Sequence, residues 1–352
     1  MLQLLLGGSG SGKTTLLYQR IRTRAEKGEK SILLVPEQFT SSTEGRIYRE
    51  LGDALSGMVE SFSFTSLAEK ILSTEGGAAV QTLSDAGRAV LVRRALEELQ
   101  DNVHYYHRHR RSAAFCQMAA QTIDELKSAG LSGQQLAQLA GACGAESGKL
   151  SELARIFQGY ETLLARSGMD PSDRLELAGA RLEEALARHS LPEFLRDRAV
   201  FIDEFDTFNA PKKRLLGAML AALPSVTVAL CDDGAPLLPG DLSLFSGAKQ
   251  VAAQLRQLAR KNGAEVAVPQ LLRKDLRHRN APGLAAVAEL LETGSCTADA
   301  PVGEVRLFAA PSREEEARAA AGAIRRLMRQ GVRCGKIAEV CHEIAKYRAA
   351  VR

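Results

Sequence analysis

A short apolar run that leads directly into a glycine-rich loop constrains this chain more than any other feature. The run from Leu2 to Leu6 is typical of a buried strand in a parallel sheet. The loop from Gly7 to Thr14 reads Gly-Gly-Ser-Gly-Ser-Gly-Lys-Thr and matches G-x-x-x-x-G-K-[ST] at every fixed position. A helix is expected from Lys13 to about Lys27. Strand, loop and helix in this order predict a P-loop α/β fold.

Such a loop predicts binding of a nucleoside triphosphate, ATP, together with Mg²⁺. Glycines allow the backbone N–H groups to surround the phosphates, and the helix that follows points its positive end at them. We expect Lys13 to reach the β and γ phosphates and the Thr14 hydroxyl to ligate Mg²⁺. The expected nucleotide-binding residues are Gly7, Gly8, Ser9, Gly10, Ser11, Gly12, Lys13, Thr14 and Thr15.

A second metal ligand is expected from a distant strand. The segment from Ala199 to Asp203 reads as a strand that ends in acidic residues. Asp203 is placed to hold Mg²⁺, directly or through water, and Glu204 to orient and deprotonate the attacking water. The structural alternative is an acidic helix cap, where Asp is favoured.

The order of expected elements predicts an α/β protein with a parallel sheet and a large all-helical insertion, followed by the start of a second α/β domain. Strands and helices alternate up to about residue 78, helical periodicity fills residues 79–196, and alternation resumes in residues 197–295. Residues 296–352 are expected to hold a linker, around 294–303, and the incomplete second domain. Further strands are expected at Ser31–Val35, Met58–Phe62, Val226–Cys231, Ala264–Val268, Val305–Ala309 and Ile337–Cys341. Further helices are expected at Thr65–Leu72, from Ser84, and at Phe115–Ala129, Leu150–Ser167, Ala210–Leu223, Gly247–Lys261 and Ser312–Gln330.

Composition excludes several classes of protein. Hydrophobic residues make up 45% and charged residues 25%, as in ordinary soluble proteins. No apolar run approaches the ~18 residues that a membrane span needs, and no signal peptide is expected before the glycine loop. The six cysteines form no Cys-x-x-Cys pair, which favours a reducing, cytoplasmic compartment. A net charge of +4 permits nucleic-acid binding without requiring it.

Taken together, these segments resemble the core of superfamily 1 helicases of the UvrD kind. Leu33 to Thr40 and Glu60 to Ala68 resemble two conserved segments of that family. The segment Val35-Pro-Glu-Gln-Phe-Thr40, together with the N-terminal glycine loop, resembles more narrowly the AddB/RexB family, the B subunits of bacterial AddAB helicase–nucleases. Ala309 to Ala317 resembles the start of that family's second motor-like domain.

The resemblance implies a RecA-like sheet and a DNA-binding subunit in double-strand break repair by homologous recombination. It implies a heterodimer with an AddA-type subunit, binding to single-stranded DNA or a duplex end, and no membrane. The DNA contacts it implies are Pro36, Gln38, Phe39, Thr40, Ser63, Phe64 and Thr65, and the candidate γ-phosphate contacts are Arg277 and Arg279. An aromatic side chain in these segments can stack on a base. The alternative is a core position under the sheet, and both readings stay open for Phe39 and Phe64.

The chain departs from the family pattern in ways that affect its expected activity. No glutamine-bearing segment precedes the loop, and Asp232-Asp233-Gly234 stands where a phosphate-sensing glutamine is expected. The family's nuclease domain and iron–sulfur cysteines are expected beyond Arg352, so we expect an N-terminal fragment without nuclease activity.

The sequence leaves two alternative functions open. The first is a DNA scaffold that binds nucleotide without turnover. The second is a P-loop kinase of nucleosides or other small molecules, although the 190 positions from Lys13 to Asp203 (203 minus 13) are far for a compact kinase.

Overall fold

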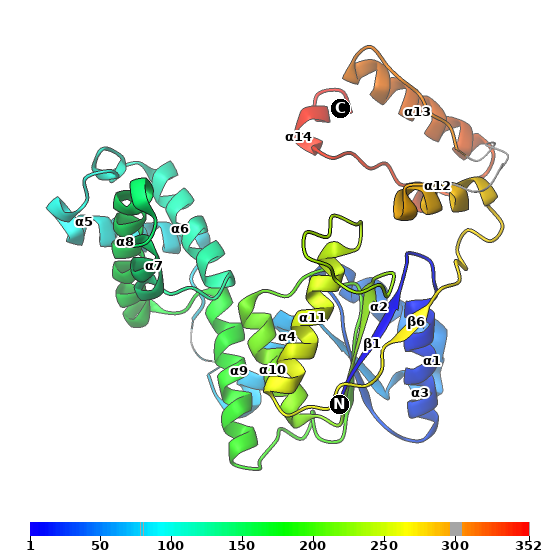
Figure 1. Ribbon diagram of the computed structural model, residues 1–352, viewed down its shortest axis with the longest axis horizontal. Helices are drawn as coiled ribbons and strands as arrows, with labels where there is room; N and C mark the ends of the chain where they lie inside the picture. Colours follow the sequence, from blue (N-terminus) through cyan, green and yellow to red (C-terminus); the bar gives the residue numbers. More distant parts are fainter. Residues whose placement is uncertain (78, 80, 296–304, 352) are drawn as a thin grey trace. The chain divides into compact units, whose positions relative to one another are not determined.

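The computed structural model describes residues 1–351 except 78, 80 and 296–304. These residues divide into two compact units, Met1–Arg277 and His278–Arg352. The first unit contains the whole sheet (Figure 1). Within the described residues, no helix is long and apolar enough to cross a membrane.

The sheet has six parallel strands in the order β3-β2-β4-β5-β1-β6, which confirms the expected α/β class. The strands are β1 (Leu2–Gly7), β2 (Ser31–Leu34), β3 (Val59–Phe62), β4 (Ala199–Ile202), β5 (Ser225–Cys231) and β6 (Gln270–Leu272). Gly7 lies opposite Cys231, and Ile202 lies opposite Val228. The carboxyl ends of β1, β4 and β5 therefore meet at one edge of the sheet.

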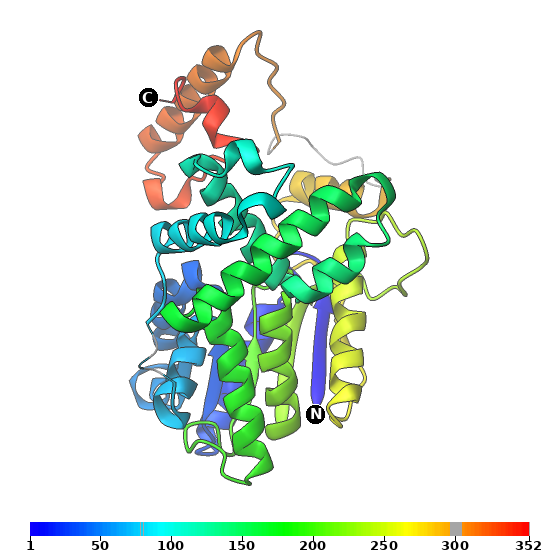
Figure 2. The ribbon, with the colours of Figure 1, turned by 90° about the vertical axis from the view of Figure 1, so that its left-hand side faces the viewer.

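Both faces of the sheet are covered by helices, as the apolar runs of its strands require. Leu4, Ile202 and Val228 share a core with helices α4, α9, α10 and α11, whereas Leu5 and Phe201 share a second core with α1 and α2. Figures 1 and 2 show these layers. The helices of the first unit are α1 (Lys13–Glu26), α2 (Thr40–Leu51), α3 (Asp53–Ser56), α4 (Phe64–Glu75), α5 (Asp85–Leu99), α6 (Ala113–Ser128), α7 (Gly133–Ala140), α8 (Ser147–Ser167), α9 (Pro171–Ala187), α10 (Ala210–Ala222) and α11 (Ser246–Lys261).

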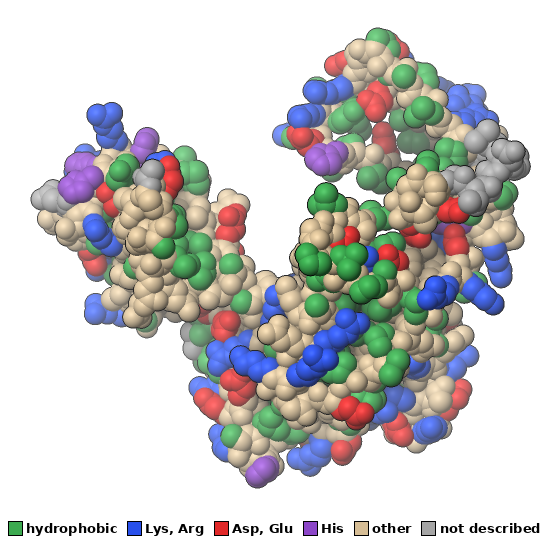
Figure 3. All heavy atoms as spheres, viewed as in Figure 1, with side chains coloured by type: hydrophobic (Ala, Val, Ile, Leu, Met, Phe, Trp, Pro, Cys, Tyr) green, Lys and Arg blue, Asp and Glu red, His purple; other side chains and the backbone are tan. Residues whose placement is uncertain are grey.

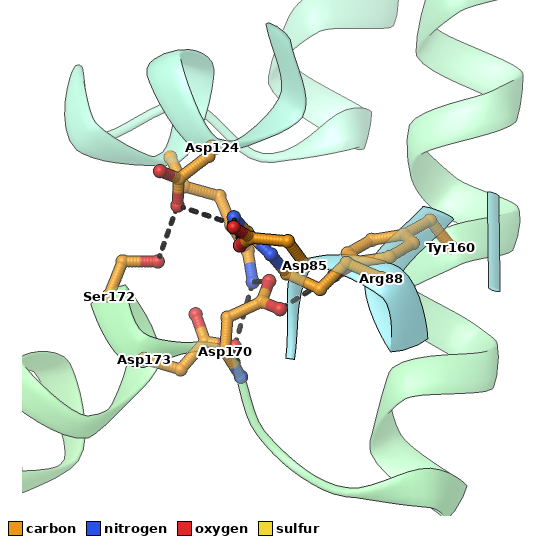
Figure 4. Close-up of polar contacts among 8 residues, drawn as sticks. Asp85, Arg88, Asp124, Tyr160, Asp170, Ser172 and Asp173 are labelled. Atoms are coloured by element: carbon orange, nitrogen blue, oxygen red, sulfur yellow. Dashed lines mark hydrogen bonds and ion pairs between the residues drawn. The ribbon is translucent and has the colours of Figure 1, made fainter. Parts of the chain in front are cut away.

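The chain between β3 and β4 is helical, and α5, α6, α7 and α8 enclose a core of their own. Helix α9 begins at Pro171, a favoured first position for proline, and packs against α4 and α10 next to the sheet. A polar network with a buried carboxylate at its centre joins α9 to the helical core (Figure 4). Asp170, whose side chain is 1% exposed, accepts hydrogen bonds from Tyr160 Oη at 2.6 Å and Lys127 Nζ at 2.7 Å.

One strand of the sheet lies later in the chain than the sequence predicts. Residues 264–268 form only a single bridge, Val266 to Leu2, and the strand itself is β6. Pro269 separates the two, and proline has no N–H to donate to a ladder. Leu2 therefore pairs with one residue before the proline, whereas Leu5 to Gly7 pair with three residues after it.

The second unit contains α12 (Pro282–Thr293), α13 (Arg313–Arg329) and α14 (Ile344–Tyr347). The expected helix at Ser312–Gln330 is confirmed by α13, but the strands expected at Val305–Ala309 and Ile337–Cys341 are wrong. Leu307 is 100% exposed and Val340 is 90% exposed, and a strand needs a neighbour to satisfy its backbone groups.

The expected linker at 294–303 falls almost wholly outside the described residues. The limits at residues 78, 196 and 295 stay a prediction.

Candidate functional site

The glycine loop joins β1 to α1 in a conformation that only glycine adopts easily. Gly10 and Gly12 have φ values of +80° and +91°. A Cβ atom at Gly10 would lie 2.6 Å from Arg277 Cβ, so the backbone approach also requires glycine. No side chain caps α1, which leaves its first N–H groups free of side-chain acceptors. A loop of this kind can accept an anion.

Polar atoms in the loop fit a phosphate group. Lys13 Nζ donates hydrogen bonds to Gly7 O at 2.7 Å and to Gly8 O at 2.8 Å, which folds the side chain back over the loop. Ser11 Oγ is buried without a hydrogen-bond partner among the described residues. A buried hydroxyl normally has a hydrogen-bond partner, so the Ser11 hydroxyl is an exception to that rule. The Lys13 ammonium carries the positive charge that suits an oxygen-rich ligand.

Asp203 follows β4 directly and faces the glycine loop, although β5 lies between β4 and β1. Its backbone N–H donates to Leu34 O at 3.1 Å, which extends the pairing of β4 with β2 by one residue. Its carboxylate accepts the Glu204 N–H at 3.0 Å and lies next to the Thr14 side chain, which lines the same cavity. Burial raises the pKa of Asp203, although the polar Thr14 side chain, the Glu204 N–H and the charge of Lys13 oppose that rise.

Glu204 stands beside Asp203 in a strained backbone conformation. Its φ is +65°, a region that costs a non-glycine residue of order 1–3 kcal/mol and is found mainly at functional sites. Burial raises the pKa of its carboxyl, and the neighbouring charge of Asp203 raises it further. The positive charges of Arg46, Lys13 and Arg277 act in the opposite direction.

A cavity of about 490 Å³ joins these residues into one site. It is lined by Ser9, Gly10, Gly12, Lys13, Thr14, Thr15, Arg46, Asp203, Glu204, Phe205, Asp206, Ala229, Cys231, Leu276 and Arg277. Most of the expected loop residues and both expected acids therefore line the same space.

Arg277, expected at the γ phosphate, also lines this cavity. Its Nη1 donates to Ser9 Oγ at 3.0 Å, and the N–H of the preceding Leu276 donates to Gly10 O at 3.0 Å. These two bonds tie the segment after β6 to the glycine loop. Arg279 belongs to the second unit.

Sequence reasoning missed Arg46, which also lines the cavity. Arg46 lies on α2, in a stretch where no helix was expected. The buried residues Thr43, Ile47 and Leu51 repeat at intervals of four, which is a signal that could have revealed the helix.

The two segments expected to contact DNA lie side by side at the carboxyl edge of the sheet, joined by a hydrogen bond of 2.9 Å from Thr65 Oγ1 to Glu37 Oε1. Gln38, Phe39 and Thr65 are exposed, and Phe39 is exposed by 37%. Thr40 is half-buried, whereas Pro36 is buried and Ser63 is buried as the N-cap of α4.

Phe64 lies in the core instead. It is 0% exposed and packs edge-on against Phe205 and Phe208, at centroid distances of 5.2 and 6.0 Å. This burial favours the core alternative for Phe64 over base stacking.

Fold and site together define an α/β protein whose parallel sheet carries a glycine loop facing a buried carboxylate. Residues 4–288 match the family described as "ADDB, N-terminal". The chain belongs to this family, and the resemblance seen in the sequence is confirmed.

Relatives of the chain agree with this family. It is 33% identical over 364 residues to a Desulforudis audaxviator protein named as the B subunit of an ATP-dependent helicase/deoxyribonuclease, a match that covers 99% of this chain and 30% of the relative. It is 32% identical to the protein of the same name from Symbiobacterium thermophilum, over 98% of this chain and 31% of that protein. For the Geobacillus kaustophilus protein the identity is 30%, over 100% of this chain and 31% of that protein. The chain thus spans just under a third of the length of these relatives.

Proposed function

We propose that this chain is the nucleotide- and DNA-binding N-terminal part of a helicase–nuclease subunit that acts in double-strand break repair by homologous recombination. Its relatives are named as B subunits of an ATP-dependent helicase/deoxyribonuclease, which supports a heterodimer with an AddA-type partner. In this proposal the sheet is a RecA-like P-loop domain and the helices between β3 and β4 are its insertion. Nuclease activity belongs to the other parts of such a subunit.

The observation that carries the proposal is the cavity shared by Lys13, Thr14, Asp203 and Glu204. Lys13 comes from the loop after β1 and the two acids come from the end of β4, so the fold joins segments far apart in the chain. An ammonium, a hydroxyl and two carboxylates are the groups that a magnesium–triphosphate requires. A glycine turn without function would not need a buried carboxylate in the same cavity as its threonine.

Each residue has a distinct role in this proposal. The loop N–H groups and Lys13 bind the phosphates, while Thr14 and Asp203 would hold Mg²⁺. Bound Mg²⁺ would neutralise the charge of the phosphate oxygens. Glu204 orients a water molecule and accepts its proton, a role suited to a carboxyl whose pKa is raised by burial.

The DNA-binding part of the proposal rests on the carboxyl edge of the sheet and on a basic face. Gln38, Phe39 and Thr65 are exposed at that edge. Lys and Arg side chains also gather over α10 and α11 (Figure 3). On α11, Arg256 and Arg260 lie one turn apart, and no ion pair joins either of them to another described residue. Unpaired cations of this kind contribute salt-dependent binding to a phosphate backbone.

The proposal is tested by measuring nucleotide binding and hydrolysis by this chain with and without single-stranded DNA. We expect Lys13→Ala to abolish Mg²⁺-dependent ATP binding, because it removes the cation that reaches the phosphates. Lys30→Ala, an exposed lysine just before β2, serves as the matched control and should bind like the unchanged chain.

The outcomes separate the alternatives. Hydrolysis stimulated by DNA and lost in Lys13→Ala supports a motor, whereas binding without turnover supports a nucleotide-dependent scaffold. Phosphate transfer to a nucleoside would replace the proposal with a kinase. If neither the unchanged chain nor the control binds ATP, the nucleotide proposal is wrong.

A further inference from the structure

Arg46 is a cationic side chain in the candidate site to which the glycine-loop pattern assigns no role. It lies on α2, one residue before Ile47, which is buried in the core. The same side chain lines the cavity of about 490 Å³ and a smaller adjoining one of about 230 Å³. Thr14, Asp203 and Glu204 line both cavities as well, so Arg46 lies where the two spaces meet.

The Arg46 guanidinium is held in place by an aromatic ring and not by a carboxylate. Its central carbon lies 4.9 Å from the centroid of Tyr18, a buried residue of α1. Among the described residues, no ion pair or hydrogen bond occupies its N–H groups. A stacked arginine keeps its five donors in a plane and free to bind an oxyanion in a bidentate manner.

The charges around Arg46 point to the ligand that it would meet. Asp203 and Glu204 are close enough for its positive charge to lower the pKa of each, against the stronger effect of burial. Neither carboxylate forms an ion pair with it, so the guanidinium stays available to a third group inside the cavity. Lys13 and Arg277 are bonded to the loop itself, at Gly7, Gly8 and Ser9.

We propose that Arg46 binds the terminal phosphate of the nucleoside triphosphate, an arginine supplied in cis from α2, so that the site distinguishes a triphosphate from a diphosphate. This inference rests on the proposed nucleotide site and adds a discriminating residue to it. Arg46 is a binding residue here, and Tyr18 is the positioning residue that keeps its guanidinium in the cavity.

The test compares the affinities of this chain for a fluorescent non-hydrolysable ATP analogue and for fluorescent ADP, both with Mg²⁺. We expect Arg46→Ala to weaken binding of the triphosphate about 10- to 100-fold, the range of a charge-assisted hydrogen bond, and to leave ADP affinity within about 2-fold. The triphosphate affinity of Arg46→Lys should lie between those of the unchanged chain and Arg46→Ala, because lysine keeps the charge and lacks the planar guanidinium. Arg49→Ala is the matched control, since this arginine lies on the same helix one turn further and lines only the smaller cavity.

The ratio of the two affinities decides the inference. An equal loss for both nucleotides, or no loss, in Arg46→Ala and Arg46→Lys overturns the role of Arg46 while leaving the nucleotide site intact. If the unchanged chain binds neither nucleotide, the proposed function and this inference both fail. Thermal unfolding of each variant without nucleotide identifies one that does not fold, and Arg46→Lys then carries the comparison.

Discussion

Replacing Lys127 by methionine should strongly destabilise the helical part of the chain between β3 and β4. Its ammonium is 2.7 Å from an oxygen of Asp170 and 2.7 Å from an oxygen of Asp173, and these side chains are 1% and 29% exposed. Methionine keeps most of the volume and removes the charge. Asp170 and Asp173 then remain close together without the cation that pairs with both, and breaking a buried pair in this way costs about 3–5 kcal/mol. Because Tyr160 still donates to Asp170, we expect the lower end, about 3 kcal/mol.

The destabilisation caused by Lys127→Met should become smaller as the pH falls. Burial already raises the pKa of Asp173, and Lys127 lowers it. Removing Lys127 raises this folded-state pKa further, so the variant takes up a proton at higher pH than the unchanged chain. A neutral acid needs no cation, and the destabilisation should therefore be full at neutral pH and shrink as the pH falls through the raised folded-state pKa.

The free energy of unfolding is best measured by urea titration with far-UV circular dichroism, because the chain contains no tryptophan. Amide hydrogen exchange would locate the loss, which we expect in α6, α8 and the start of α9. Lys149→Met is the matched control. Lys149 pairs with Glu146 at the surface, where the side chains are 53% and 63% exposed, so its replacement should leave the free energy of unfolding nearly unchanged. Equal effects of the two variants, or a Lys127 effect that grows on acidification, would refute this reasoning.

Three further changes test the site and its support. Gly10→Ala should abolish nucleotide binding, because the φ of +80° and the approach of Arg277 leave no room for a Cβ; calorimetric titration that finds unchanged affinity would contradict this. Asp203→Asn should weaken Mg²⁺-dependent nucleotide binding and flatten its pH dependence, because the raised pKa of Asp203 makes the unchanged chain lose affinity as pH falls, from a higher pH than an ordinary aspartate would. Binding titrations at several pH values check it, and an identical pH profile in both proteins would count against a metal role. Phe64→Ala should cost about 3–5 kcal/mol of unfolding free energy as a core truncation, whereas Phe39→Ala should cost below about 1 kcal/mol and weaken single-stranded DNA binding; thermal unfolding and fluorescence anisotropy separate the two, and the reverse order would be inconsistent with the observed burial.

The sheet could be predicted from the sequence because its strands are short, apolar and bounded by clear stop signals. Leu2 to Leu6 and Val226 to Cys231 were expected almost as they occur, since strands covered on both faces form continuous apolar runs. The end strand was displaced because Pro269 shifts pairing to Gln270–Leu272, whose moderate hydrophobicity gives little signal. The strands expected at Val305–Ala309 and Ile337–Cys341 failed for another reason. A strand forms only where a neighbouring strand pairs with it, and an apolar run does not show whether such a neighbour exists.

The candidate site was predictable where one local motif specifies the geometry, and not where tertiary packing does. Lys13 and Thr14 follow from the loop pattern, and Asp203 follows from an apolar strand that ends in acid. Arg46 joins them only because α2 packs against the sheet beside Tyr18. Nothing in the local sequence distinguishes Arg46 from Arg49, and one turn of helix decides which of them lines the main cavity.

Glu204 has a positive φ, a backbone conformation that glycine adopts without strain. Glu204→Gly should therefore make the chain more stable by about 1 kcal/mol, because it removes the strain of a side chain at positive φ. The same change deletes the carboxyl proposed to accept a proton from water. At this position stability and the proposed function are in opposition, and the chain carries the residue that is worse for folding.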